Sequence, residues 1–332
     1  MTRILITRTG YRRLQTQLAA IPGLVCLTID LDGVVRRDDR DEVPGDSDFD
    51  CTWVRSDFFT SGIAKIFIDT LAGSKTLDWV QSAGAGTDHP IFPMVVGKGA
   101  RLSTSHHQAD GMAEYVLWGV LDHFQGGRGR AAEQTAHVWG RRQWREIGGT
   151  RWLIIGYGAI GEAVARRAKG FDVHVTGVRR RPGPAPFADS VVSPDQIHSQ
   201  LGDSDVVVVC APRTAATENM VDPDFLAAMK ADSVLVNIGR GVLVDEEALL
   251  AALDAGKPAH AVLDVFRTEP LPADSRFWDH PRVTLTSHGS ARSANNEARG
   301  DAVFLENLRR YVAGEQPLNQ VSAADVLGAL SR

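Results

Sequence analysis

The sequence has few cysteines, no long apolar run and a short apolar N-terminus. Its three cysteines, Cys26, Cys51 and Cys210, are too few for a disulfide framework, and we expect reduced, mostly buried thiols in a cytoplasmic protein. No apolar run approaches the roughly 18–20 residues that span a membrane. The apolar stretch that ends at Thr7 predicts a first strand rather than a signal peptide.

Basic charge and metal-ligand spacings are also lacking. The net charge of −5 predicts neither a nucleic-acid surface nor a membrane surface. His89, His106, His107 and His123 show no metal-ligand spacing, so we expect no metal site. A hydrophobic content of 43% over 332 residues indicates a globular chain too long for one comfortable core, and therefore two domains.

The first hundred residues alternate short apolar runs with one helical segment. Residues 24–29, 51–54 and 78–81 predict strands, and residues 62–71 predict a helix between them. This alternation is typical of a parallel sheet with crossover helices. Residues 84–88 carry two glycines and predict a turn.

A predicted helix over 110–124 leads into a Gly- and Arg-rich segment, residues 125–145. Trp139 and Trp144 in this segment indicate either a subunit interface or packing against the sheet, and the sequence leaves both open.

The second half repeats the alternation more regularly. A helix over 246–255 has Asp245 as its predicted N-cap. An amphipathic helix near the C-terminus, with Phe304, Leu308 and Val312 at helical spacing, can pack on either domain. The predicted strands cover residues 151–155, 173–178, 206–210, 234–237, 259–263 and 283–286, which is typical of a doubly wound α/β domain of about six strands.

A glycine-rich turn joins the strand 151–155 to a helix. Gly156 permits a tight turn, Gly158 allows backbone to approach a pyrophosphate, and Gly161 allows close helix–strand packing. The free N–H groups of the helix N-terminus then attract phosphate. We predict a nicotinamide dinucleotide site on the segment Gly156, Tyr157, Gly158, Ala159, Ile160 and Gly161.

The next strand ends in Arg179, Arg180 and Arg181, where NAD enzymes usually carry an acidic residue for the ribose hydroxyls. Guanidinium groups can pair with a 2′-phosphate, and Arg179 and Arg180 therefore predict a preference for NADP(H), with NAD(H) as a second cofactor. The alternative is a solvated basic loop.

Three polar residues follow predicted strand ends further along the chain. Arg240 can bind carboxylate and ketone oxygens. His288 can donate a proton near neutral pH. Glu269, if hydrogen-bonded to His288, would favour the imidazolium and fix the ring. Together they predict the reduction of a small 2-keto acid, although each residue alone is also typical of a surface or structural position.

Several ordered motifs carry a resemblance to a known family. Residues 77–88, 112–115, 237–241, 263–272 and 287–288 follow one another as in the D-isomer-specific 2-hydroxyacid dehydrogenases, and the chain most resembles the glyoxylate/hydroxypyruvate reductase branch. The resemblance implies Arg240, Glu269 and His288 as the catalytic residues, and Pro212, Thr217 and Asp264 near the nicotinamide. It also implies a loop whose backbone N–H groups bind the substrate carboxylate, formed by Ala83, Gly84, Ala85, Gly86 and Thr87.

The resemblance further implies a homodimer and a split architecture. A Rossmann cofactor domain, residues 106–290, would be inserted in a flavodoxin-like substrate domain made of residues 1–105 and 291–332. Two departures from the family, Thr87 and the step Gly289–Ser290, leave the substrate open. Formate dehydrogenases, which carry Gln where this chain has Glu269, and nucleotide-sensing corepressor-like proteins are the alternatives on this fold.

Overall fold

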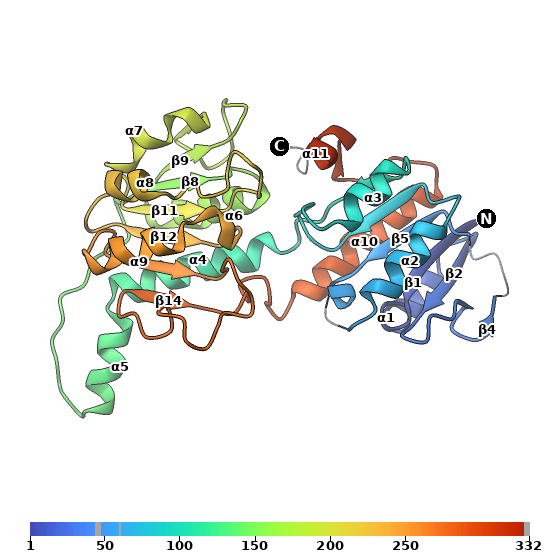
Figure 1. Ribbon diagram of the computed structural model, residues 1–332, viewed down its shortest axis with the longest axis horizontal. Helices are drawn as coiled ribbons and strands as arrows, with labels where there is room; N and C mark the ends of the chain where they lie inside the picture. The colour runs from blue at the N-terminus through green and yellow to red at the C-terminus, as the bar shows by residue number, and fades with distance from the viewer. Residues whose placement is uncertain (44–47, 60, 329–332) are drawn as a thin grey trace. The chain divides into compact units, whose positions relative to one another are not determined.

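A computed structural model describes residues 1–43, 48–59 and 61–328 and divides the chain into two compact units (Figure 1). Unit 1 consists of Met1–His107 and Ala294–Arg332, and unit 2 consists of Gln108–Ser293. The chain therefore leaves unit 1, builds unit 2, and returns to unit 1 with its last segment.

Within the described residues, unit 1 contains one sheet with the strand order β15-β7-β6-β5-β1-β2-β3-β4. The strands β2-β1-β5-β6-β7 are parallel and follow the 2-1-3-4-5 order of flavodoxin-like sheets. The edges differ from the purely parallel sheet expected, because β3, β4 and β15 pair antiparallel. These three strands are two residues long, which is too short for an alternating apolar pattern to reveal. The bounds are β1 Thr2–Thr7, β2 Leu24–Ile29, β3 Arg36–Arg37, β4 Asp41–Glu42, β5 Cys51–Val54, β6 Trp79–Ser82, β7 Arg101–Ser103 and β15 Gln320–Val321.

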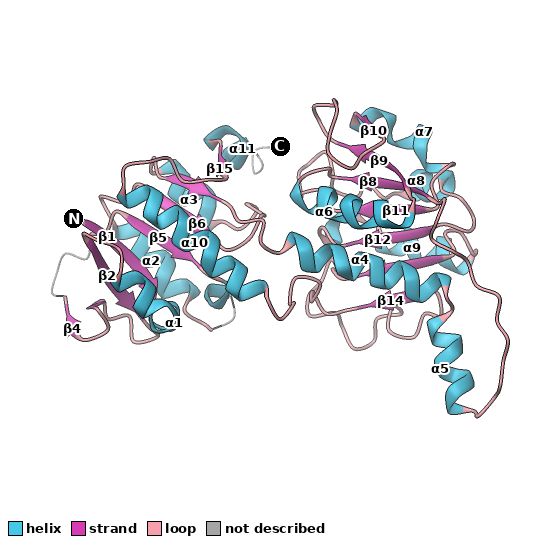
Figure 2. Cartoon of the chain, turned by 180° about the vertical axis from the view of Figure 1, so that it is seen from behind, coloured by secondary structure: helices cyan, strands magenta, loops and turns pink. Residues whose placement is uncertain are grey.

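Helices cover both faces of this sheet (Figure 2). Thr7 caps the first helix, its side chain accepting a hydrogen bond from the Gly10 N–H. The ring of Phe304 on α10 stacks on Trp53 of β5, with centroids 4.0 Å apart, so the C-terminal helix packs on unit 1. The helices are α1 Arg8–Ala19, α2 Ala64–Gly73, α3 Ile91–Gly97, α10 Asn296–Val312 and α11 Ala323–Gly328, with a 3-10 turn η1 at Ser56–Phe59.

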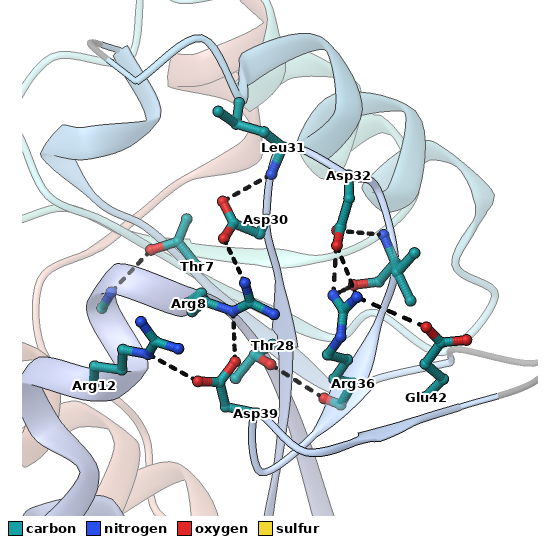
Figure 3. A network of polar contacts seen from close by, with 12 residues as sticks. Thr7, Arg8, Arg12, Thr28, Asp30, Leu31, Asp32, Arg36, Asp39 and Glu42 are labelled. Atoms are coloured by element: carbon teal, nitrogen blue, oxygen red, sulfur yellow. Dashed lines mark hydrogen bonds and ion pairs between the residues drawn. The ribbon is translucent and has the colours of Figure 1, made fainter.

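At the N-terminus of α1, Arg8 forms ion pairs with Asp30 and Asp39, and Arg12 also forms one with Asp39 (Figure 3). Arg36 pairs with Asp32 beside them. These ion pairs fasten the antiparallel β3–β4 edge to α1 and to the end of β2.

Among the described residues, unit 2 contains a parallel sheet with the order β10-β9-β8-β11-β12-β13-β14. This is the 3-2-1-4-5-6 order of the Rossmann fold with one further strand, and the predicted α/β class is confirmed for both units. Sequence reasoning missed the edge strand β10, which has only three residues. The bounds are β8 Arg151–Ile155, β9 His174–Val178, β10 Ser190–Val192, β11 Val206–Val209, β12 Val234–Asn237, β13 His260–Leu263 and β14 Val283–Leu285.

Alternate residues of these strands enter two cores on opposite faces of the sheet. Trp152 and Ile154 pack with α4 and α6, whereas Leu153 and Ile155 pack with α7, α8 and α9. Burial on both faces explains the all-valine strand β11. The helices are α4 Ala109–Phe124, α5 Gly127–Thr135, α6 Ala159–Ala168, α7 Ile197–Leu201, α8 Pro223–Ala228 and α9 Glu246–Asp254, with 3-10 turns η2 Lys169–Phe171, η3 Pro194–Gln196 and η4 Gly241–Leu243.

The segment from α5 to residue 146 extends away from the sheet of unit 2 (Figure 1). None of the residues of α5 is buried. Trp139 is 93% exposed and Trp144 50% exposed, so packing of these tryptophans against the sheet is wrong for the single chain. In the described part of the chain, no helix combines the length and the apolar character that a bilayer crossing requires.

Candidate active site

The three predicted catalytic residues follow the carboxyl ends of adjacent strands of unit 2. Arg240 follows β12, Glu269 follows β13, and His288 follows β14. In open α/β sheets this edge is where ligands bind.

A turn after β12 positions Arg240. The Asn237 carboxamide oxygen accepts a hydrogen bond from the Gly239 N–H at 3.1 Å, and its Nδ2 donates to the Arg240 carbonyl at 3.0 Å. The next residue, Gly241, packs against the backbone of Phe266, where a Cβ would come within 1.9 Å of the Phe266 carbonyl carbon. Only glycine therefore allows the Arg240 turn to approach the segment that carries Glu269.

Glu269 and His288 are in direct contact. The Glu269 Oε2 lies 2.7 Å from the His288 Nδ1, and its Oε1 accepts a hydrogen bond from the Phe266 N–H at 2.9 Å. The carboxylate is thus held from one side and orients the imidazole from the other. Because Nδ1 is engaged, Nε2 is the ring nitrogen from which a proton can be donated.

The backbone holds His288 in a left-handed conformation, with φ of +48°. Its N–H donates to the Asp264 carbonyl at 2.8 Å. The Asp264 carboxylate, 1% exposed, accepts hydrogen bonds from Thr286 Oγ1 and from the N–H groups of Gly289 and Ser290. Asp264 was expected near the nicotinamide, and its carboxylate holds the turn that presents His288.

The glycine-rich turn has the geometry that each glycine was expected to supply. Gly156 has φ of +98°, and a Cβ there would lie 2.5 Å from the Ala211 nitrogen. A Cβ at Gly161 would lie 2.8 Å from the Gly156 oxygen. At Gly158, the N-cap of α6, a Cβ would meet nothing within 4 Å. Tight packing on both sides of an open backbone position forms a cradle that fits a pyrophosphate, with Ala159 and Ile160 in the first turn of the helix.

The basic segment after β9 folds back on itself. Arg179 Nη2 donates to the carbonyls of Gly183 and Pro184, at 3.0 and 3.2 Å. Its Nε is buried and has no hydrogen-bond partner among the described residues. Arg180 and Arg181 are exposed. The Nε donor of Arg179, next to the exposed Arg180 and Arg181, therefore fits an anionic group of the cofactor.

The loop that begins at Pro212 is closed by Thr217. The Thr217 hydroxyl lies 2.8 Å from the Pro212 carbonyl oxygen and accepts from the Thr214 N–H at 2.8 Å. Both residues expected at the nicotinamide therefore belong to one compact turn after β11.

The predicted substrate loop follows β6 in unit 1. The N–H of Ala83 donates to Val54, and the N–H of Gly84 to the Ser82 hydroxyl, at 2.9 and 3.1 Å. Those of Ala85, Gly86 and Thr87 donate no hydrogen bond within the part of the chain that the structure describes. Among the described residues, three of the five predicted amides are therefore without an intramolecular acceptor.

Sequence reasoning missed two residues that shape the site. Asn237 had a signal, because asparagine at a strand end with glycine two residues later is typical of an Asx turn. Tyr115 of α4 had none: its hydroxyl lies 2.8 Å from Thr286 Oγ1 through a contact between distant segments, and burial raises the pKa of its phenol.

Comparisons with known proteins identify the family. The model of the D-isomer specific 2-hydroxyacid dehydrogenase NAD-binding domain matches residues 117–290. The chain belongs to that family. It is accordingly an NAD(P)-dependent oxidoreductase, which sets aside the binding-protein alternative.

Relatives support this assignment over most of the chain. A Corynebacterium melassecola protein, named only as an uncharacterized protein in the proB 3′ region, is 31% identical over 79% of this chain and 87% of its own length. The glyoxylate/hydroxypyruvate reductase A of Yersinia enterocolitica is 30% identical over 63% of this chain and 66% of its own length. The predicted resemblance to that branch is confirmed.

Solved structures agree with the fold. A D-isomer specific 2-hydroxyacid dehydrogenase from Xanthobacter autotrophicus, solved in complex with NADPH and MES, superposes with a TM-score of 0.78 and is 27% identical. The match covers 98% of this chain and all of that one.

Proposed function

We propose that this enzyme reduces a small 2-keto acid to the D-2-hydroxy acid with NADPH, and catalyses the reverse oxidation. The observation that carries the proposal is the 2.7 Å contact between His288 Nδ1 and Glu269 Oε2 at the carboxyl edge of the cofactor-domain sheet. We assign unit 1 as the substrate domain and unit 2 as the cofactor domain.

His288 supplies the proton in this mechanism. The Glu269 carboxylate keeps a proton on Nδ1 and stabilises the imidazolium, so Nε2 donates to the ketone oxygen as it gains negative charge. A nicotinamide cofactor held by the glycine-rich turn would supply the hydride for the ketone carbon. In the oxidative direction, neutral His288 removes the hydroxyl proton through the same nitrogen.

Arg240 and the loop amides bind the substrate. The planar guanidinium of Arg240 can engage carboxylate and ketone oxygens together. The N–H groups of Ala85, Gly86 and Thr87, which have no acceptor among the described residues, are suited to a carboxylate, because charge-assisted hydrogen bonds to backbone amides are strong.

Preference for NADP(H) over NAD(H) is supported by the end of β9. No carboxylate stands at 179–181 to repel a 2′-phosphate, and Arg179 Nε has no partner among the described residues. The NADPH complex of the Xanthobacter relative is consistent with this preference.

We further propose a cytoplasmic homodimer. Cys26, Cys51 and Cys210 are free thiols, as expected in a reducing compartment. We call the segment from α5 to residue 146 the arm; its exposed tryptophans, Trp139 and Trp144, offer the apolar surface that a subunit interface buries.

The test is steady-state oxidation of NADPH and of NADH with glyoxylate, hydroxypyruvate, pyruvate, phenylpyruvate and a branched keto acid. We expect turnover with at least one of the smaller acids and a higher kcat/KM with NADPH. No turnover with any 2-keto acid would refute the proposal. Formate is assayed separately with NADP⁺ and NAD⁺ as hydride acceptors, because formate dehydrogenases share the fold, and oxidation of formate alone would favour that function over ours despite Glu269.

A further inference from the structure

Tyr157 stands inside the glycine-rich turn, but its side chain turns away from the phosphate cradle. The side chain is 5% exposed and covers Gly177 of β9, where a Cβ would lie 2.4 Å from the tyrosine ring. Gly177 thus makes room for the ring on the strand that leads to Arg179. Burial raises the pKa of this phenol, so the hydroxyl remains a donor.

The Tyr157 hydroxyl donates to the Pro186 carbonyl at 2.7 Å. Pro186 ends the segment that begins at Arg179, and Arg179 Nη2 donates to carbonyls in the middle of it. Two side chains therefore hold an otherwise exposed stretch, residues 180–184, of which only Gly183 is half-buried. Gly183 itself has φ of +151°, a conformation that glycine adopts without strain.

From this arrangement we propose that Tyr157 is a positioning residue for the basic segment 179–186, and that it thereby sets the preference for a cofactor with a 2′-phosphate. The inference rests on the proposed use of NADP(H). Tyr157 acts through the segment and touches neither the hydride nor the substrate. Without its hydrogen bond, the segment moves more freely and the guanidinium groups must be ordered when the phosphate binds.

The decisive variant is Tyr157→Phe, which keeps the ring over Gly177 and removes the hydroxyl. The matched control is Tyr311→Phe in unit 1, whose hydroxyl bonds to Asp78 at 3.0 Å. Calorimetry of the free enzyme measures the Kd of NADP⁺ and of NAD⁺. A neutral hydrogen bond changes an equilibrium by roughly 2- to 12-fold, so we expect the Kd for NADP⁺ to rise about fivefold. The Kd for NAD⁺ should stay within about twofold, as should both values in the control.

Limited trypsin digestion without cofactor gives an independent readout. In Tyr157→Phe the bonds after Arg179 and Arg180 should be cut faster than in the wild type, and NADP⁺ should protect them. The inference is overturned if Tyr157→Phe keeps the wild-type ratio of the two Kd values, or if digestion there is not accelerated. A wild-type enzyme that binds both cofactors equally would instead refute the proposed NADP(H) preference, so the two failures are distinguishable.

Discussion

Removal of the histidine acid should slow turnover by orders of magnitude without loosening its turn, provided that the replacement tolerates the backbone of position 288. His288 has φ of +48°, and most residues lose about 1–2 kcal/mol in that region. Asparagine is among the residues enriched there. His288→Asn should therefore keep the stability within about 0.5 kcal/mol, whereas kcat should fall by roughly 10²–10⁴, the usual contribution of a general acid.

Glu269→Gln tests whether the carboxylate acts through that histidine. The change replaces a charge-assisted hydrogen bond by a neutral one, a difference of about 1 kcal/mol. The side chains of His288 and Glu269 are 53% and 36% exposed, so solvent screens the charge and the loss should not exceed this difference. A difference of about 1 kcal/mol corresponds to about a fivefold loss of kcat. In the His288→Asn background the same change should have no further effect, because residues that act as one unit are not additive.

The assay is NADPH oxidation at saturating keto acid, with unfolding midpoints for all four proteins. Turnover of His288→Asn within tenfold of the wild type would refute the assignment of the acid. A full fivefold loss from Glu269→Gln in the asparagine background would show that Glu269 acts independently of His288.

Three other predictions concern the cofactor turn, pH and assembly. Gly161→Ala should weaken binding of both cofactors, since its Cβ would lie 2.8 Å from the Gly156 oxygen, whereas Gly170→Ala, which meets nothing within 4 Å, should bind them normally in calorimetry. Burial lowers the pKa of His260 from 6.5 to about 3, so the contribution of the neutral imidazole to stability is complete above pH 6.5 and is lost as pH falls toward 3. His260→Gln should therefore remove about 1.4 kcal/mol per pH unit from the slope of the unfolding free energy between these two pH values, as measured by urea titration. Trp139→Arg should shift the sedimenting species toward monomer, while Trp278→Arg, a 44% exposed tryptophan outside the arm, should not.

Strand and helix positions in unit 2 followed from the sequence because burial on both faces leaves a strong signal. The predicted strand at 234–237 coincides with β12, and Asp245 caps α9 by accepting from the Ala248 N–H. The antiparallel edge strands of unit 1 were not predicted, because strands as short as Arg36–Arg37 are determined by pairing with the neighbouring strand rather than by their own residues.

The catalytic residues of the candidate site were predictable from the sequence, but the hydrogen bonds that position them were not. The order of Arg240, Glu269 and His288 suggested their roles, and the structure places the last two in contact. Asp264 was identified only as a residue near the nicotinamide, because hydrogen bonds to the N–H groups of Gly289 and Ser290 depend on a turn that no periodicity encodes. The sequence could not show that the Ala83 N–H is engaged, because its bond to Val54 is a tertiary contact, whereas the bond from the Gly84 N–H to the Ser82 hydroxyl is local and spans two residues.

The turn that presents His288 has room for a side chain at position 289. The bond from Gly289 to Asp264 comes from the backbone, the φ of Gly289 is not in the left-handed region, and a Cβ would meet nothing closer than 4.0 Å. A side chain therefore fits, and glycine is not required by the backbone. Gly289→Ile should unfold within about 2 °C of the wild type, yet raise KM for phenylpyruvate more than for glyoxylate. An equal change in both KM values would mean that the step after His288 does not line the substrate pocket.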